Sequence, residues 1–266
     1  MDSAINGEST QPVQRYFQQR RAAPIRLREA LTSQDLDLVM SETTHGRATG
    51  QSLDSRHGPL ISLVEQKGFR QHFQPNSTVL LHGDPANAVY FIESGIIRCC
   101  TIDGHGRRQI FSFAKKGEFV GLSDTDRWHF TAEAVDHVIV KSVPRAILEQ
   151  EIAGSTPLRH EVRAYIRGLL EQREKLLLTL ANANGPDRLY GFLEDFAASR
   201  SNAGYVVLPM CRRDIGDHIG LSTESVSRAF SDLKRKGRID LKSHEKYRIV
   251  AKSEGFQTPE RSHTPL

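Results

Sequence analysis

Three side chains near the carboxyl terminus have the chemistry needed to read the edges of nucleic-acid bases. Glu224 and Arg228 are four residues apart and Ser227 directly precedes Arg228, so all three share one face of a predicted helix. The planar guanidinium of an arginine matches O6 and N7 of guanine, a glutamate oxygen accepts from N4 of cytosine, and a serine hydroxyl can contact thymine. The alternative interpretation is a solvated Glu–Arg pair, which contributes only about 0.2–0.5 kcal/mol to helix stability.

The segment that holds these residues has the pattern of two short helices joined by a tight turn. It begins at Arg212 and reads RRDIGDHIGLSTESV. Gly216 permits close packing, Gly220 permits the positive φ of the turn, and Ser222 is a favourable helix cap. We expect the second helix to begin at Ser222 and to run to Lys236, as in a helix-turn-helix.

Positive charge is concentrated in the same part of the chain. Residues 210–252 hold 11 Lys and Arg against 6 Asp and Glu, whereas the whole chain has 36 against 32. A predicted hairpin over residues 238–250 would form a wing beside the second helix. This distribution favours binding to double-stranded DNA, whose phosphates would be contacted first. The phosphate contacts that we expect are Arg212, Arg213, Ser222, Thr223, Lys242 and Lys246.

Residues 57–150 consist of short apolar runs, each closed by a turn signal. The run Val89–Ile92, for example, precedes Ser94-Gly95, and Ile96–Thr101 precedes a Gly-rich turn. No helical period separates these runs, and strands at this spacing are typical of an antiparallel roll or sandwich. We therefore predict an α+β chain with an amino-terminal antiparallel β-roll, a jelly roll like that of cyclic-nucleotide-binding domains.

A helical period follows over residues 151–183. Six residues spaced alternately four and three apart form the a/d stripe of a helix that pairs with another helix. They are Val162, Ile166, Leu169, Arg173, Leu176 and Leu180. We interpret this stripe as a homodimer interface, weakened by two Arg173 side chains that face each other; the alternative is a helix that only covers its own domain. The helix should end at a left-handed Gly185, before a DNA-binding domain over residues 184–252.

The overall composition limits the remaining possibilities. The chain has 266 residues, of which 38% are hydrophobic and 26% charged, as in globular proteins of one or two domains. No stretch approaches the roughly 18 consecutive apolar residues of a membrane span, and no secretory signal is present, so we expect a cytoplasmic protein without membrane contact. Residues 1–56 are polar and predict a mostly disordered extension, and residues 253–266 a flexible tail.

The 3 cysteines and 11 histidines do not follow a metal-ligand spacing, so we expect no metal, no cofactor and no enzymatic activity. Cys99 and Cys100 would face opposite sides of one strand as ordinary thiols. Cys211 begins the first helix of the motif beside Arg212 and Arg213, where positive charge favours a thiolate, and it is a possible redox thiol or simply a small residue at a cap. The alternative function is a β-roll metalloenzyme or ligand-binding protein with an accessory DNA-binding tail.

The order of β-roll, long helix and winged helix-turn-helix resembles the CRP/FNR family of bacterial transcription regulators, over about residues 58–252. More narrowly, RRDIGDHIGLSTESVSR is similar to the FNR and FixK branch. The DNA-reading Glu-x-x-Ser-Arg signature of that branch corresponds here to Glu224, Ser227 and Arg228.

The resemblance implies a homodimeric regulator, most often an activator, that binds a TTGAT-N4-ATCAA palindrome and controls genes of low-oxygen metabolism. It also implies a contact between RNA polymerase and a surface loop of the roll. The matching loop residues are Ile102, Asp103, Gly104, Gly106 and Arg107.

Two departures from the family concern cofactors. FNR itself holds an iron-sulfur cluster on cysteines that lie mostly near its amino terminus, whereas no cysteine precedes Cys99 here. Members that bind cyclic nucleotides carry a Gly-Glu and a later Arg-Ser pair that grips the phosphate. Gly117-Glu118 is present, but Phe130-Thr131 stands at the Arg-Ser position. A phenyl ring cannot replace the cation, so we expect neither an iron-sulfur cluster nor binding of cyclic AMP.

Overall fold

The computed structural model describes residues 58–123, 125–198 and 204–250. The extension predicted for residues 1–56 and the tail predicted for residues 253–266 lie outside these ranges. Among the described helices, none has both the length and the apolar character that crossing a membrane requires.

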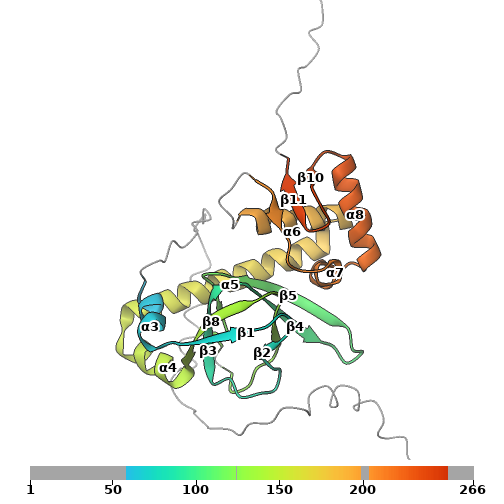
Figure 1. The fold of residues 1–266 in the computed structure, drawn as a ribbon. Coiled ribbons are helices and arrows are strands. Elements are labelled where there is room, and N and C mark those ends of the chain that lie inside the picture. Colours follow the sequence, from blue (N-terminus) through green and yellow to red (C-terminus); the bar gives the residue numbers. More distant parts are fainter. Residues whose placement is uncertain (1–57, 124, 199–203, 251–266) are drawn as a thin grey trace, which may run out of the picture. The chain divides into compact units, whose positions relative to one another are not determined.

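The first compact unit, which ends at Leu177, is built on two antiparallel sheets (Figure 1). The strands of one sheet are β1 (Phe69–Phe73), β3 (Ala88–Ser94), β6 (Phe119–Val120) and β8 (Val138–Pro144). Those of the other sheet are β2 (Thr78–Leu80), β4 (Ile96–Ile102), β5 (Arg108–Lys115) and β7 (Thr131–Ala134). Their orders are β1-β8-β3-β6 and β2-β7-β4-β5. The predicted antiparallel β-roll is confirmed.

The core of the roll lies between the two sheets. Ile92 of β3 and Val140 of β8 meet Ile97 of β4 there, and all three are fully buried. Cys99 lies in this core, and the pairing of β4 with β5 shifts register between Cys99 and Cys100. Both thiols are buried and unbridged, as expected, and burial raises the pKa of Cys99.

Three helices close the outer face of the first sheet: α3 (Pro59–Lys67), α4 (Arg145–Gly154) and the amino-terminal part of α5 (Thr156–Asn182). Leu158 and Val162 of α5 are buried there. The hydroxyl of Tyr165 accepts a hydrogen bond of 2.7 Å from the backbone N–H of Phe119 in β6. These contacts attach the first half of α5 to its own roll.

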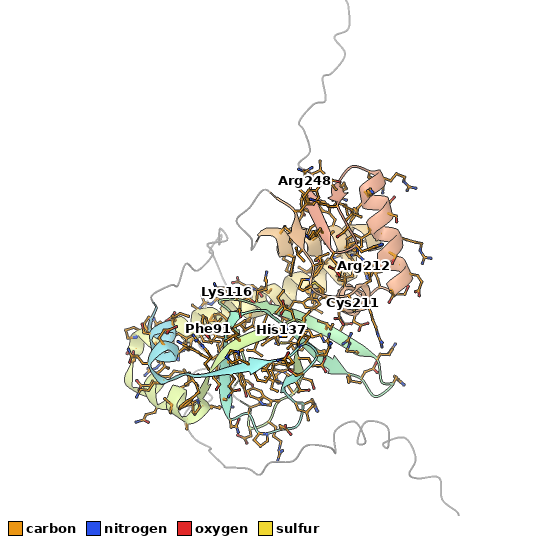
Figure 2. All side chains as sticks on the ribbon, in the orientation of Figure 1. Phe91, Lys116, His137, Cys211, Arg212 and Arg248 are labelled. Atoms are coloured by element: carbon orange, nitrogen blue, oxygen red, sulfur yellow. The ribbon has the colours of Figure 1, made fainter. Side chains whose placement is uncertain are left out.

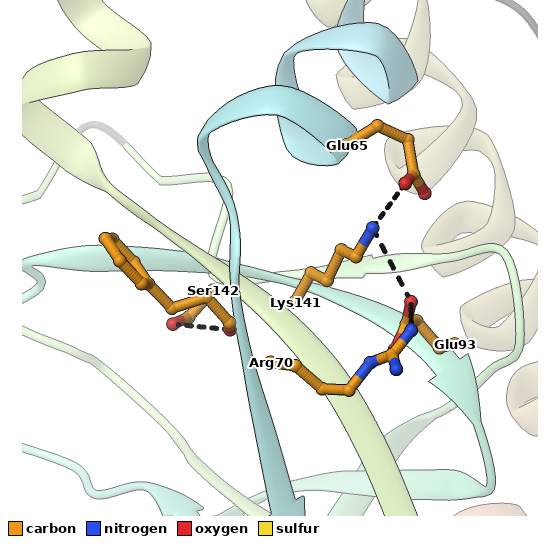
Figure 3. Close-up of polar contacts among 6 residues, drawn as sticks. Glu65, Arg70, Glu93, Lys141 and Ser142 are labelled. Carbon is orange, nitrogen blue, oxygen red and sulfur yellow. Dashed lines mark hydrogen bonds and ion pairs between the residues drawn. The ribbon is translucent and has the colours of Figure 1, made fainter.

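An ionic network also joins α3 to the first sheet (Figure 3). The ammonium of Lys141 in β8 pairs with Glu65 of α3 and lies 3.7 Å from the carboxylate of Glu93 in β3. Arg70 of the edge strand β1 completes the network, with 2.7 Å between its Nε and Glu93 Oε2. Because the groups come from four different elements, the network fixes the edge of the sheet under α3.

The second unit begins at Leu178 and contains a winged helix-turn-helix. Its elements are α6 (Gly185–Ala198), β9 (Val206–Val207), α7 (Arg212–Ile219), α8 (Thr223–Arg235), β10 (Ile239–Leu241) and β11 (Lys246–Ile249). The strands form a small antiparallel sheet of order β10-β11-β9. Buried Tyr247 anchors this sheet to α6, since its hydroxyl donates to the carbonyl of Leu193 at 2.7 Å. The expected helix-turn-helix with a wing is confirmed.

The connection between α5 and α6 differs from the prediction. Gly185 does not adopt the left-handed conformation; it is the first residue of α6. The carboxamide of Asn184 caps α6 instead, accepting from the N–H of Asp187 at 3.1 Å. Arg188 donates to the carbonyl of Ala183 at 2.8 Å, so side chains and not a left-handed glycine satisfy backbone groups at this connection.

Candidate nucleic-acid interface

The turn between α7 and α8 depends on two glycines. Gly220 has φ +67° and ψ +43°, which confirms the predicted left-handed turn. Gly216 is required for a more specific reason than close helix packing, because a Cβ there would lie 2.4 Å from the carbonyl oxygen of Leu221. The two glycines therefore set the direction in which α8 leaves the turn.

Helix α8 has one buried face and one exposed face. Its buried side chains are Val226, Ala229, Phe230 and Leu233. Ser222 caps the helix as predicted, accepting from the N–H of Ser225 at 3.2 Å. The structure brings Glu224, Ser227 and Arg228 together on the exposed face. Capping and burial thus hold these three side chains outward on a rigid helix.

The chemistry of the three exposed residues suits hydrogen bonding to bases. Hydrogen bonding to its own backbone N–H and to Ser222, together with the charge of Arg228, lowers the pKa of Glu224, which is therefore an acceptor at neutral pH. Arg228 donates to the hydroxyl of Ser225 at 3.1 Å, which uses one of its five donors. The hydroxyl of Ser227 donates to the Thr223 carbonyl at 3.0 Å and keeps its capacity as an acceptor.

The wing presents Lys242 and Lys246 at the two ends of its turn. Both side chains are exposed, and the N–H of Lys242 donates to the carbonyl of Lys246 at 3.0 Å, which closes the turn. The ammonium of Lys242 lies 5.7 Å from the ring centroid of Tyr205. Arg248 of β11 pairs with Asp240 of β10 at 3.1 Å, so part of the wing charge is compensated within the sheet.

The structure gives the two adjacent arginines of α7 different surroundings. Arg213 is exposed. Arg212 is half-buried, with its Cζ 3.3 Å from the ring centroid of Phe230 and its Nη2 donating to the carbonyl of His244 at 2.7 Å. Figure 2 labels Arg212 beside Cys211 in this unit. The phosphate contact predicted for Arg212 stays a prediction, while the geometry shows a contact within the domain.

Acidic neighbours compensate several other cations, and a count of charges could not show which cations these are. Asp232 pairs with both Arg235 and Lys236 at the end of α8. Arg238 pairs with Asp187 of α6 at 2.7 Å. The two pairs of Asp232 could have been predicted from the sequence, because their partners follow it by three and four residues on one helix. The pair of Arg238 with Asp187 could not, because these residues lie far apart in the sequence.

Cys211 is the N-cap residue of α7 and is exposed and unbridged. Its side chain makes no capping hydrogen bond. The sulfur is therefore open to solvent next to Arg212 and Arg213, in the place that the sequence predicted. Whether it is a redox thiol stays a prediction.

The predicted dimer stripe of α5 is divided between two environments. Val162 is 8% exposed and lies in the core of its own roll, which corrects its placement in the predicted interface. Leu169, Leu176 and Leu180 are partly buried. The most exposed apolar residues of the helix are Ile166, Leu170, Leu177 and Leu178, at 39%, 48%, 65% and 64%. The exposed apolar residues thus share Ile166 with the six predicted positions, and Leu170 and Leu177 lie beside them on the helix.

In the roll, the position of the phosphate-gripping pair is part of the core. Phe130 is buried, and its ring packs edge-on against Phe111 at 5.4 Å and against Trp128 at 6.1 Å between centroids. The Thr131 hydroxyl accepts from the N–H of His82 at 3.2 Å. Within residues 58–123, 125–198 and 204–250, no cluster of three or more His, Cys, Asp or Glu is placed to hold a metal ion.

Comparisons with known proteins agree with this architecture. A model of the cyclic nucleotide-binding domain matches residues 70–155, and a model of the Crp-like helix-turn-helix domain matches residues 187–253. The nitrogen fixation regulation protein FixK of Azorhizobium caulinodans is 32% identical over 201 residues, which cover 74% of this chain and 81% of that protein. The chain belongs to the CRP/FNR family of transcription regulators.

Other members of the CRP/FNR family support the same assignment. FixK of Bradyrhizobium diazoefficiens is 33% identical over 182 residues, covering 66% of this chain and 76% of that one. The solved structure of FixK2 from Bradyrhizobium japonicum has a TM-score of 0.67 and 29% identity, and covers 69% of this chain and 93% of that chain. These relatives are named as regulators, so this FixK-like chain is a DNA-binding transcription regulator and not an enzyme, and the metalloenzyme interpretation is rejected.

Proposed function

We propose that this regulator acts as a homodimer in the cytoplasm, binds a TTGAT-N4-ATCAA palindrome and activates transcription. The observation that carries the proposal is the joint exposure of Glu224, Ser227 and Arg228 on one face of α8, whose other face is buried. A helix presented in this way from a helix-turn-helix enters the major groove with its amino-terminal half.

The chemistry of the three residues suits the proposed half-site. The guanidinium of Arg228 reads O6 and N7 of the guanine, and the Glu224 carboxylate accepts from N4 of a cytosine on the opposite strand. Ser227 contacts the edge of a thymine. Arg213, Ser222, Thr223, Lys242 and Lys246 contact phosphates around this centre, and such contacts position the protein without reading sequence.

A palindrome requires two copies of the motif related by a two-fold axis. The exposed stripe of α5 offers an apolar surface for this purpose. Ile166, Leu170 and Leu177 follow one another at spacings of four and seven residues, so they line one side of the helix. We assign the dimer interface to this stripe, with Leu169, Leu176 and Leu180 at its margin.

The turn between β4 and β5 is the proposed contact with RNA polymerase. The carboxylate of Asp103 accepts from the N–H of His105 at 2.9 Å and from the N–H of Arg107 at 3.0 Å, and pairs with the Arg107 side chain at 2.9 Å. These bonds order the turn, which includes Gly104 and Gly106, and Ile102 is exposed beside it. A preorganised turn with an exposed apolar residue suits protein binding.

We propose that DNA binding needs neither cyclic AMP nor an iron-sulfur cluster. The aromatic packing of Phe130 supports the first point. The carboxylate of Glu118 also has a hydrogen bond within its own turn, because its Oε2 accepts from the N–H of Lys115 at 3.0 Å. Burial raises the pKa of Glu118. The absence of cysteines before Cys99 supports the second point. The likeness to proteins named as nitrogen fixation regulators and as anaerobic regulatory proteins supports a link to genes of low-oxygen metabolism.

A titration of two variants tests the base-reading assignment. Arg228→Ala should lose roughly 1–3 kcal/mol specifically on the palindrome and lose discrimination at its guanine, because one bidentate contact disappears. Lys242→Ala should weaken binding to every sequence alike. Both variants are titrated, without effector, against the palindrome and a guanine-substituted duplex at one salt concentration. Full retention of sequence preference by Arg228→Ala would contradict the proposal.

A further inference from the structure

Arg212 joins three elements of the DNA-binding unit. It is the first residue of α7, its guanidinium covers the ring of Phe230 in α8, and it donates to the backbone carbonyl of His244 in the wing turn. Burial lowers its pKa to about 10, so it is still charged at neutral pH. A planar cation over an aromatic ring, with a hydrogen bond in the plane of the fork, is an arrangement that arginine makes and lysine does not.

The wing turn is held at two successive carbonyl groups. The carbonyl of Glu245 accepts from the backbone N–H of Leu208 at 2.7 Å, and the carbonyl of His244 accepts from Arg212 at 2.7 Å. The donor of the first hydrogen bond lies in the segment after β9, and the donor of the second lies in the helix-turn-helix itself. The Arg212 side chain is therefore a direct physical link between α8 and the turn that carries the wing lysines.

We propose that Arg212 is a positioning residue for DNA binding, which holds the wing at a set distance from α8 and thereby places Lys242 and Lys246 against the phosphates. The inference rests on the proposed function, because it requires that these lysines contact DNA. This role differs from a direct contact between Arg212 and a phosphate. In the proposed role, Arg212 acts by fixing the position of the wing and not by its charge.

Two substitutions separate geometry from charge. Arg212→Lys keeps the positive charge but loses the planar fork, and Arg212→Met keeps an apolar stem over Phe230 but loses both charge and hydrogen bond. If the residue positions the wing, both variants should lower affinity for the palindrome by a similar factor of about 10. The ratio of affinities for the palindrome and the guanine-substituted duplex should stay that of the parent, because α8 is unchanged.

The same variants are then made in a chain that carries Lys242→Ala and Lys246→Ala. If Arg212 acts through the two lysines, its substitution has no further effect once they are removed. The additional loss of DNA affinity caused by each Arg212 variant in this background should therefore fall below about twofold. Arg213→Ala is the matched control, because Arg213 is adjacent, exposed and of the same charge. Arg213→Ala should lower DNA affinity by the same factor in both backgrounds. It should also reduce the salt dependence of binding by the amount expected for about one phosphate contact.

Phe230→Leu gives an independent readout, since it removes the ring under the guanidinium while keeping an apolar side chain in the core. It should show the same dependence on the two lysines. Amide hydrogen exchange at the wing turn should be faster in Arg212→Lys, Arg212→Met and Phe230→Leu. Exchange in the buried part of α8 should stay unchanged in the two Arg212 variants, because they leave its core side chains in place.

Three results would overturn the proposal. One is parent-like affinity of Arg212→Lys together with a loss in Arg212→Met, which would mean that charge alone matters. Another is a loss that persists in the lysine-free background. The third is an absence of any effect of the two lysine substitutions in the parent. None of these results changes the outcome expected for Arg228→Ala. Failure of the role proposed for Arg212 can therefore be distinguished from failure of base reading by Arg228.

Discussion

The guanidinium of Arg173 lies over the ring of Phe111, with 4.9 Å between its Cζ and the ring centroid. Phe111 belongs to β5 of the same roll, and its ring also packs against Phe130. Arg173 is thus turned toward its own domain by a cation–π contact, although its spacing placed it in the middle of the predicted dimer stripe. Repulsion between two Arg173 side chains is therefore not expected to limit dimerisation.

Leu177→Glu should weaken the dimer. Each copy would lose the burial of one leucine and would place a carboxylate in the interface, at a cost of roughly 2 kcal/mol or about 30-fold in the dimer constant. Sedimentation velocity over a concentration series measures this constant. Gln172→Glu, on the polar side of the helix, is the control, and Arg173→Leu should change the constant less than twofold. A dimer that becomes severalfold tighter in Arg173→Leu would show that Arg173 faces the partner.

Peroxide should inhibit DNA binding through Cys211. This sulfur is exposed at the start of α7 beside Arg213, and oxidation to a sulfinate would add negative charge where a phosphate is proposed to bind. Binding of the palindrome is measured before and after treatment of the parent and of Cys211→Ala. We expect inhibition of the parent only, because the buried Cys99 and Cys100 are protected. Equal inhibition of both proteins would remove Cys211 from the mechanism.

Ser222→Ala should lower both stability and affinity. The hydroxyl of Ser222 accepts from the N–H of Ser225, and loss of an N-cap side chain costs about 1 kcal/mol. Fraying of this turn would also disorder Glu224, so binding of the palindrome should weaken more than binding of unrelated DNA. Urea unfolding and DNA titration measure the two effects. Ser222→Asp, which restores the cap, should recover the stability, and its failure to do so would argue against capping.

Asp187 should make the stability of the DNA-binding unit sensitive to acid. Its hydrogen bond with Arg238 lowers the pKa of Asp187 below the ordinary value of 3.8. Since the pKa is lower in the folded state, the stabilisation is present above pH 3.8 and is lost as the pH falls through the folded pKa. Asp187→Asn should therefore be less stable than the parent at pH 6 and should approach it near pH 2. A constant difference across that range would contradict this assignment.

Local pattern was sufficient to predict most elements of the fold. The turn signals after the apolar runs predicted β3 and β4, and Gly220 with the Ser222 cap predicted the turn and the start of α8. Edge strand β1 was not predicted because its sequence, FRQHF, has no alternation of buried and exposed residues. Its backbone pairing with β8 forms the strand, and Phe69 is 64% exposed. Such a strand has no signal in hydrophobic period.

Residue types and their spacing were enough to place this chain in its family and to put Glu224, Ser227 and Arg228 on one helix face, because both depend on short-range geometry. The direction of long, flexible side chains was decided only by the tertiary structure. Arg212 and Arg213 are the same residue type in adjacent positions, yet one meets Phe230 and the wing turn while the other is exposed. The partners of Arg212 are distant in sequence, so only folding brings an aromatic ring and a carbonyl group within its reach.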